Sequence, residues 1–177
     1  MTSFDLKSIT NAPFEQSSIS ALEGHAKSQA SSGQYDFDAN KSLMKAYACV
    51  GSDNGDMMAT LLALSMMRLP SPHFLQLSYL VPGKMSSSND KIAVLIKCAD
   101  LLEKAKFPTF WSEIRCDTTA AVLKDIKGFE DSVRGFVLTV VSKTFKNIEK
   151  STLLGMLGLS EDGTADADSS YVPFGST

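Results

Sequence analysis

Few residues in the sequence could act as metal ligands or nucleophiles, and they are not spaced as in known catalytic or metal-binding motifs. His25 and His73 are the two histidines of the chain, and neither has a second metal ligand three or four residues away. The three cysteines lack the Cys-x-x-Cys spacing of zinc sites and of thioredoxin-like redox motifs. No segment has the glycine spacing of a P-loop, a dinucleotide-binding loop or a Gly-x-Ser-x-Gly nucleophile turn. The sequence therefore predicts no catalytic, cofactor-binding or metal-binding residues, and we expect a protein that is not an enzyme.

Clustered carboxylates are the next candidates for chemistry. Glu130 and Asp131 begin a predicted long helix, where acidic side chains complement the helix dipole, and Arg134 follows one turn after Glu130. No histidine lies nearby in the sequence, so this group is interpreted as a self-paired helix start rather than a catalytic acid pair. Asp166-Ala167-Asp168 begins like a calcium loop, but Tyr171 occupies the position that requires glycine.

The composition is that of a globular protein. Of the 177 residues, 44% are hydrophobic and 21% are charged, which is typical of one folded domain. The net charge of -3 provides no positive field to attract nucleic acid or anionic lipid. The longest apolar runs are far shorter than the ~20 residues of a membrane span, so no membrane contact is expected. The N-terminus does not resemble a secretory signal, which predicts a cytoplasmic protein whose cysteines are reduced and buried.

Hydrophobic spacing of three and four residues predicts a helical chain throughout. A polar loop is predicted over Lys84–Ser88, and no segment alternates in the manner of a strand. In the first half of the chain, the predicted helices are one from Phe14 that ends before Gly33, one capped by Asp36 or Asp38 that stops near Gly51, an almost wholly apolar helix over 57–69, and a short helix over 72–81. The next three are a helix capped by Ser88, Asn89 or Asp90 that continues to about 106, a short one over 107–114, and one capped by Thr118 or Thr119. The last two are a long helix over 129–148 and one capped by Ser151 that ends at Gly158.

The apolar helix over 57–69 is predicted to be central, because its hydrophobic residues surround it. Its methionines favour a role in filling the core, although they could also line an adaptable binding groove. Successive helix pairs average roughly forty residues, which is near the period of HEAT repeats, but no internal sequence repeat accompanies that period. Beyond Leu159 the periodicity ends, and 160–177 is acidic and lacks basic residues, which predicts a disordered tail.

Several segments resemble the family of subunit K of eukaryotic translation initiation factor 3. The resemblance rests on three groups of residues that keep the order and spacing of that family. They are Tyr35, Asp36 and Asn40 in the first helical hairpin; Phe110 and Trp111 in the middle; and Gly128, Phe129, Glu130, Asp131 and Arg134, followed by Met156, Leu157 and Gly158, near the end.

The resemblance implies an all-α fold in which a helical-repeat superhelix is followed by a winged-helix module of the PCI type. On that basis the chain divides into a disordered N-terminus (1–13), a helical-repeat domain (14–150), the first helix of a partial winged helix (151–159) and the acidic tail (160–177). Family members continue with two more helices and a β wing after Ser151–Leu157, whereas this chain runs into Gly163-Thr164-Ala165, so the module is expected to be truncated.

The resemblance also implies a function. The expected role is that of a non-catalytic scaffold subunit of initiation factor 3, with subunit L as its foremost partner and the small ribosomal subunit reached through the complex. Leu153, Leu154, Met156 and Leu157 are the predicted partner-binding residues. Two alternatives stay open, namely a helical adaptor of a related PCI assembly such as the proteasome lid or the signalosome, and a weak RNA-binding protein using Lys143, Lys146 and Lys150.

Overall fold

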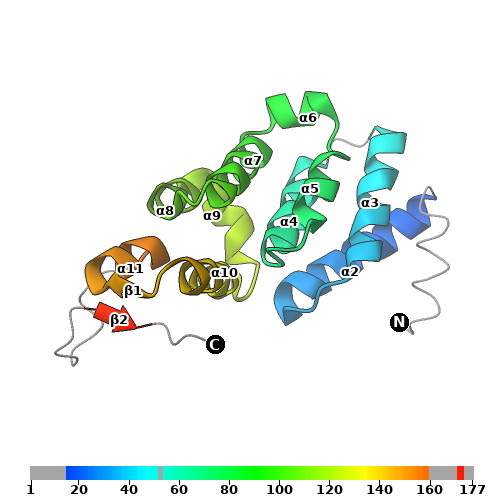
Figure 1. Cartoon of the computed structure of the whole chain (residues 1–177). Coiled ribbons are helices and arrows are strands. Elements are labelled where there is room, and N and C mark those ends of the chain that lie inside the picture. Colours follow the sequence, from blue (N-terminus) through cyan, green and yellow to red (C-terminus); the bar gives the residue numbers. More distant parts are fainter. Residues whose placement is uncertain (1–14, 52–53, 160–170, 174–177) are drawn as a thin grey trace.

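The computed structural model describes residues 15–51, 54–159 and 171–173 (Figure 1). The predicted disordered N-terminus over 1–13, and the predicted tail apart from 171–173, lie outside the described residues. The regular secondary structure of the described residues is helical except for two strands of three residues each, which confirms the all-α class. The helices are α2 (Gln16–Ser32), α3 (Phe37–Val50), α4 (Gly55–Met66), α5 (His73–Ser78), α6 (Gly83–Ser88), α7 (Asp90–Glu103), α8 (Phe107–Ile114), α9 (Asp117–Lys124), α10 (Phe129–Thr144) and α11 (Lys150–Leu157).

Local capping chemistry sets several of these helix ends. The Asp36 side chain accepts a hydrogen bond from the amide of Ala39 and caps α3, as predicted. Asn89 caps α7 in the same way, by accepting from the amides of Lys91 and Ile92. Gly33 and Gly51 end α2 and α3 in the left-handed conformation, which lacks a steric cost for glycine.

Two predictions about helix boundaries between α5 and α9 were wrong. The segment expected to be a polar loop forms α6, because Met85 is buried and the Ser86 and Ser87 hydroxyls donate to the Gly83 carbonyl. Helix α9 begins after Cys116, so Thr119 does not cap it. The Thr119 hydroxyl is buried and donates instead to the Ile114 carbonyl at 2.6 Å.

The long helix predicted over 129–148 ends early, at Thr144. Phe145 is extended, and β1 (Asn147–Glu149) pairs antiparallel with β2 (Tyr171–Pro173), so that Ile148 lies opposite Val172. The structure thus differs from the prediction of a tail that is disordered over all of 160–177. The strands were missed because three residues are too few to show alternation.

Helix α4 is the centre of the core. Ten of its twelve residues are buried, and it packs against α2, α3, α5, α7, α9 and α10 (Figure 1). Met57, Met58 and Met66 are all buried within it, which confirms that the methionines of this helix fill the core. The central position predicted from its apolar surface is also confirmed.

A buried amide pair ties α2 to α3. Gln29 Nε2 donates to Asn40 Oδ1 at 2.9 Å, and Asn40 Nδ2 donates back to Gln29 Oε1 at 3.0 Å. The same Gln29 oxygen accepts the backbone amide of Asp36 at 2.8 Å, at the residue that caps α3. The pair therefore positions both the helix and the turn before it, which gives a structural role to two residues singled out in this segment, Asp36 and Asn40. Tyr35 instead stacks on His73.

Replacing Asn40 is expected to destabilise the whole fold. Asn40→Ala leaves the buried Gln29 Nε2 without its acceptor, which costs about 1–3 kcal/mol of unfolding free energy. Gln34→Ala, at an exposed position of the same turn, should cost less than about 0.5 kcal/mol. Urea unfolding followed by circular dichroism measures both, and equal losses for the two variants would contradict the role assigned to the amide pair.

Candidate protein-interaction site

The C-terminal unit of β1, α11 and β2 is attached to the helical array through the end of α11. Three side chains, from α8, from its C-cap residue Arg115 and from α10, donate to three consecutive backbone carbonyls there. Trp111 Nε1 donates to Met156 O at 2.8 Å, Arg134 Nε to Leu157 O at 3.3 Å, and Arg115 Nη2 to Gly158 O at 3.1 Å. The last carbonyls of a helix have no partner within the helix, and cations are favoured beside them. These contacts define what we call the α11 junction.

The two carbonyls that precede these three are satisfied within the chain. Gly158 is left-handed, with φ of 64°, and its amide donates to Gly155 O, while the Leu159 amide donates to Leu154 O at 3.0 Å. This pattern is a Schellman motif, which terminates a helix at glycine. Together with the three side-chain donors, it leaves no carbonyl between Leu154 and Gly158 unpaired.

Trp111 is the centre of the junction. Its indole is almost fully buried, and the guanidinium carbons of Arg115 and Arg134 lie 5.1 and 5.3 Å from a ring centroid of this residue. Both distances are within the range of cation–π attraction. A Cβ atom on Gly158 would lie 2.5 Å from the indole Cγ, so the helix end is packed directly against the ring.

Glu130 connects the two arginines. Its carboxylate accepts from Arg115 at 3.1 Å and from Arg134 at 2.6 Å, while Asp131 accepts from Arg134 at 3.0 Å. The hydrogen bond from Arg115, followed by the positive charges of Arg115 and Arg134, lowers the pKa of Glu130 against the opposing effect of partial burial. The predicted self-paired helix start is therefore present, and it also holds Arg115 from another helix.

The structure gathers some of the residues singled out by sequence into this junction and leaves the others elsewhere. Glu130, Asp131, Arg134, Trp111 and the end of α11 are in contact through the hydrogen bonds above. Phe110 and Phe129 are buried in the adjoining core, and Gly128 precedes α10 in the left-handed conformation. Tyr35 and Asp36 belong instead to the turn between α2 and α3, and Asn40 lies in the first turn of α3.

One residue of the junction was missed from the sequence. Arg115 contacts Trp111, Glu130 and the Gly158 carbonyl, yet its partners lie 15 and 43 residues away along the chain. Its spacing of four from Trp111 is the only local signal that could have indicated it.

The leucines predicted to bind a partner are mostly not accessible. Leu153, Leu154 and Leu157 are each only 8% exposed, and Met156 is partly buried against the core. The exposed large apolar residues near this unit are Leu138 (39%) and Phe145 (40%) of the α10 segment and Leu159 (44%). Leu138 lies on α10, whereas Phe145 follows the last residue of that helix in an extended conformation.

The cysteines differ from the prediction that all are buried. Cys98 is buried, and burial raises the pKa of its thiol to about 12. Cys49 is exposed and Cys116 is intermediate. Burial acts to raise the pKa of Cys116, but hydrogen bonds with Thr119 and Thr118 at the start of α9 outweigh it, so that the pKa is lowered.

Within residues 15–51, 54–159 and 171–173, no group of three or more histidine, cysteine, aspartate or glutamate side chains is arranged to hold a metal ion. In the same residues, no helix is long and apolar enough to cross a membrane.

These features define an all-helical protein that carries a small strand-containing unit locked onto one end of its helical array. The model of the CSN8/PSMD8/EIF3K family matches residues 53–168, a range that includes the whole α11 junction. The chain belongs to this family.

Relatives named eukaryotic translation initiation factor 3 subunit K are similar to the chain over most of its length. The protein from Drosophila grimshawi is 34% identical over 151 residues, and those from Drosophila erecta and Drosophila persimilis are each 35% identical over 151 residues. Each alignment covers 84% of this chain and 66% of the relative. The chain therefore spans about two thirds of the length of these relatives.

Gly158 is expected to be intolerant of any side chain. Gly158→Ala adds a left-handed alanine, which costs about 1 kcal/mol, and a methyl group against the indole, which costs about 1–3 kcal/mol more. Gly33→Ala is a matched control, because Gly33 is also left-handed but has open space around it. Chemical denaturation of both variants isolates the contact with Trp111, and equal destabilisation would show that this contact is not tight.

The Glu130 bridge predicts a stability difference that depends on pH. Because the folded-state pKa is lowered, the contribution is present above the ordinary glutamate pKa and is lost as the pH falls through the folded-state value. Glu130→Gln should cost no more than about 1 kcal/mol at pH 7, since the carboxylate is partly exposed. Urea titrations from pH 7 to pH 3 should show the two proteins converging, and a constant gap would contradict the assignment.

Proposed function

We propose that the chain is a non-catalytic scaffold subunit of eukaryotic translation initiation factor 3, acting in translation initiation through protein–protein contacts. The observation that carries this proposal is the match of 151 residues to proteins named subunit K of that factor. Two structural features support the proposal. They are the wholly helical array and the α11 junction, which holds the C-terminal unit in one position. A rigidly held unit presents a preformed surface, which lowers the entropic cost of binding.

The proposed partners are other subunits of the factor, subunit L foremost, with the small ribosomal subunit reached through the complex. The proposed location is the cytoplasm, where translation takes place. The alignment covers 66% of the length of these relatives, so the proposed partners are those that the matched part of a subunit K protein would contact.

The domain organisation proposed is a helical-repeat domain followed by part of a winged-helix module. Consecutive helices pack as neighbours, with α2 against α3, α4 against α5 and α7 against α8, which supports stacked helical pairs. The antiparallel pairing of β1 with β2 beside α11 supports the winged-helix assignment, since a small sheet next to helices is what a wing requires.

The contact surface proposed for a partner subunit is a pair of exposed apolar side chains, Leu138 on α10 and Phe145 directly after its end, which we call the α10 surface. These side chains are 39% and 40% exposed, whereas the leucines of α11 are buried. A few residues near the centre of an interface contribute most of its binding energy when water is excluded from them. The α10 surface therefore replaces Leu153, Leu154 and Leu157 as the proposed site.

The alternatives have weaker support. A helical adaptor of another PCI assembly is compatible with the family description, but the relatives named above are subunits of the initiation factor. Weak RNA binding would rest on Lys143, Lys146 and Lys150, and the net charge of -3 opposes it.

Affinity purification from the organism's own cells at moderate salt, with mass spectrometry, tests the proposal. The tagged chain should recover subunits of initiation factor 3, with subunit L among them. The double variant Leu138→Ser, Phe145→Ser should reduce that recovery at least about tenfold, because truncating central apolar contacts costs more than 1 kcal/mol each. The control Leu75→Ser, Tyr79→Ser removes exposed apolar residues from α5 and its C-cap position and should leave recovery unchanged.

Three outcomes would contradict the proposal. Recovery of proteasome-lid or signalosome subunits would favour the adaptor reading, and salt-sensitive retention of RNA without subunits would favour RNA binding. Equal losses for the two double variants would show that α10 is not the contact surface.

A further inference from the structure

One side of α10 is exposed along most of the helix. α10 packs against α4 and α11, and its buried valines lie on the side that faces the core. On the other side, Gly135, Leu138 and Ser142 are all exposed, at intervals of four and three residues. Residues with that spacing form one continuous stripe along a helix. We call this stripe the outer face of α10.

The shape of the outer face suits the packing of a second helix. Leu138 is its large apolar side chain, and Gly135 and Ser142 lie about one turn before it and one turn after it. A Cβ atom on Gly135 would meet nothing within 4 Å, so the space above this glycine is open. A large side chain that stands between small ones is the arrangement in which the side chains of two helices interlock.

The hydroxyl groups beside Leu138 already have acceptors. The Thr139 hydroxyl donates to Gly135 O at 2.8 Å, and the Ser142 hydroxyl donates to Thr139 O at 3.0 Å. Burying a hydroxyl that lacks a hydrogen bond would oppose binding, but each of these donors keeps its acceptor inside the helix. An apolar surface can therefore cover this face without leaving either donor unpaired.

The C-terminal end of α10 carries a local excess of positive charge. Lys143 and Lys146 are exposed, and neither forms a salt bridge within residues 15–51, 54–159 and 171–173. Between positions 135 and 159 the sequence has three lysines and one carboxylate, Glu149, although the net charge of the chain is -3. This end of the helix therefore attracts carboxylates.

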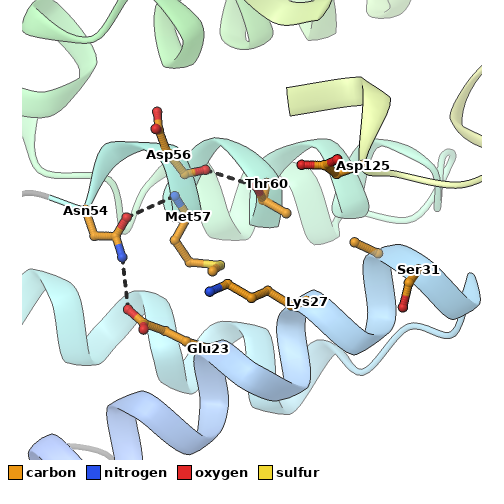
Figure 2. Close-up of a pocket in the computed structure, with 9 residues that line it drawn as sticks. Glu23, Lys27, Ser31, Asn54, Asp56, Met57, Thr60 and Asp125 are labelled. Carbon is orange, nitrogen blue, oxygen red and sulfur yellow. Dashed lines mark hydrogen bonds between the residues drawn. The ribbon is translucent and has the colours of Figure 1, made fainter. Parts of the chain in front are cut away.

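Another charged surface of the molecule has the opposite sign. A groove of about 520 Å³ is lined by residues of α2 and α4 and by Asp125 (Figure 2). Glu23, Asp56 and Asp125 contribute three carboxylates to its lining, and Lys27 contributes one ammonium group. An acidic ligand is repelled by that groove and attracted by the end of α10, so the distribution of charge directs an acidic segment to α10.

We propose that the outer face of α10 binds an amphipathic α-helix of a partner subunit, with acidic residues of that helix beside Lys143 and Lys146. This inference rests on the proposed function, because it specifies the kind of segment that contacts the α10 surface. The apolar residues of the bound helix, spaced three and four apart, pack around Leu138 and over Gly135. Its carboxylates pair with the two lysines and set its direction. An RNA strand would use the lysines but not the apolar stripe.

Photo-crosslinking in the organism's own cells tests what the outer face binds. The full chain carries benzoylphenylalanine in place of Ser142, and a control chain carries it in place of Gln76, an exposed residue of α5. Mass spectrometry of the peptide captured at Ser142 should show apolar residues three and four apart with acidic residues in an adjoining turn. The chain with the probe at Gln76 should not capture that peptide. The identity of the recovered proteins tests the proposed function, whereas the pattern of the captured segment tests this inference, so the two can fail separately.

A pair of glycine variants tests the close approach of the helix. Gly135→Gln fills the open position and should lower recovery of the captured partner at least about fivefold, because it overpacks the interface. Gly24→Gln is the matched control, since Gly24 is an exposed glycine of α2 with nothing within 4 Å of its Cβ position, and it should leave recovery unchanged. Replacing a helical glycine favours the folded state, so neither variant should unfold at a lower temperature.

A pair of charge reversals tests the acidic part of the ligand. Lys143→Glu with Lys146→Glu should lower recovery about two- to tenfold, because two attractive charge pairs become repulsive. Lys124→Glu with Lys127→Glu is the matched control, because these two lysines are also exposed and three residues apart. The control changes the net charge by the same amount and should leave recovery unchanged.

Four outcomes would overturn the proposal. They are a captured segment that is basic or lacks apolar residues at helical spacing, crosslinking to RNA instead of protein, the absence of any protein crosslinked at Ser142, and equal effects within either matched pair of variants.

Discussion

The burial of Trp111 against the end of α11 is the contact on which the C-terminal unit depends. An isolated helix of eight residues is marginal in water, and a sheet of two short strands is not stable alone. Both elements are held because the indole donates to Met156 O and packs against Gly158. The position of this unit relative to the helical array is therefore set largely by one side chain of α8.

The interactions around Trp111 differ in their energetic weight. Burying an indole and pairing helix-terminal carbonyls contribute on the order of several kcal/mol, because large apolar area leaves water and no polar group is left unpaired. The Glu130 bridge contributes much less, since exposed ion pairs are screened by solvent. Its carboxylate instead orients Arg115 and Arg134, which each reach a carbonyl of α11. The Glu130 carboxylate therefore contributes more to the orientation of Arg115 and Arg134 than to the free energy of folding.

Two exposed surfaces of the molecule differ in chemistry. The groove lined by residues of α2 and α4 and by Asp125 combines carboxylates with apolar side chains, whereas Leu138 and Phe145 are an exposed apolar pair at α10. Both are built on helices anchored to the core, and α4 contacts α2 as well as α10.

The sequence by itself determined the helical class, the central α4 and those helix ends where the signal is local. Asp36, Asn89 and Gly158 act on residues within one turn, so their roles can be read from neighbouring positions. The strand at Ile148, the burial of Leu153 and the contacts of Arg115 were decided by tertiary structure alone. Their partners lie tens of residues away, as Trp111 and Met156 do at a separation of 45, and no periodicity in the sequence records such a pairing.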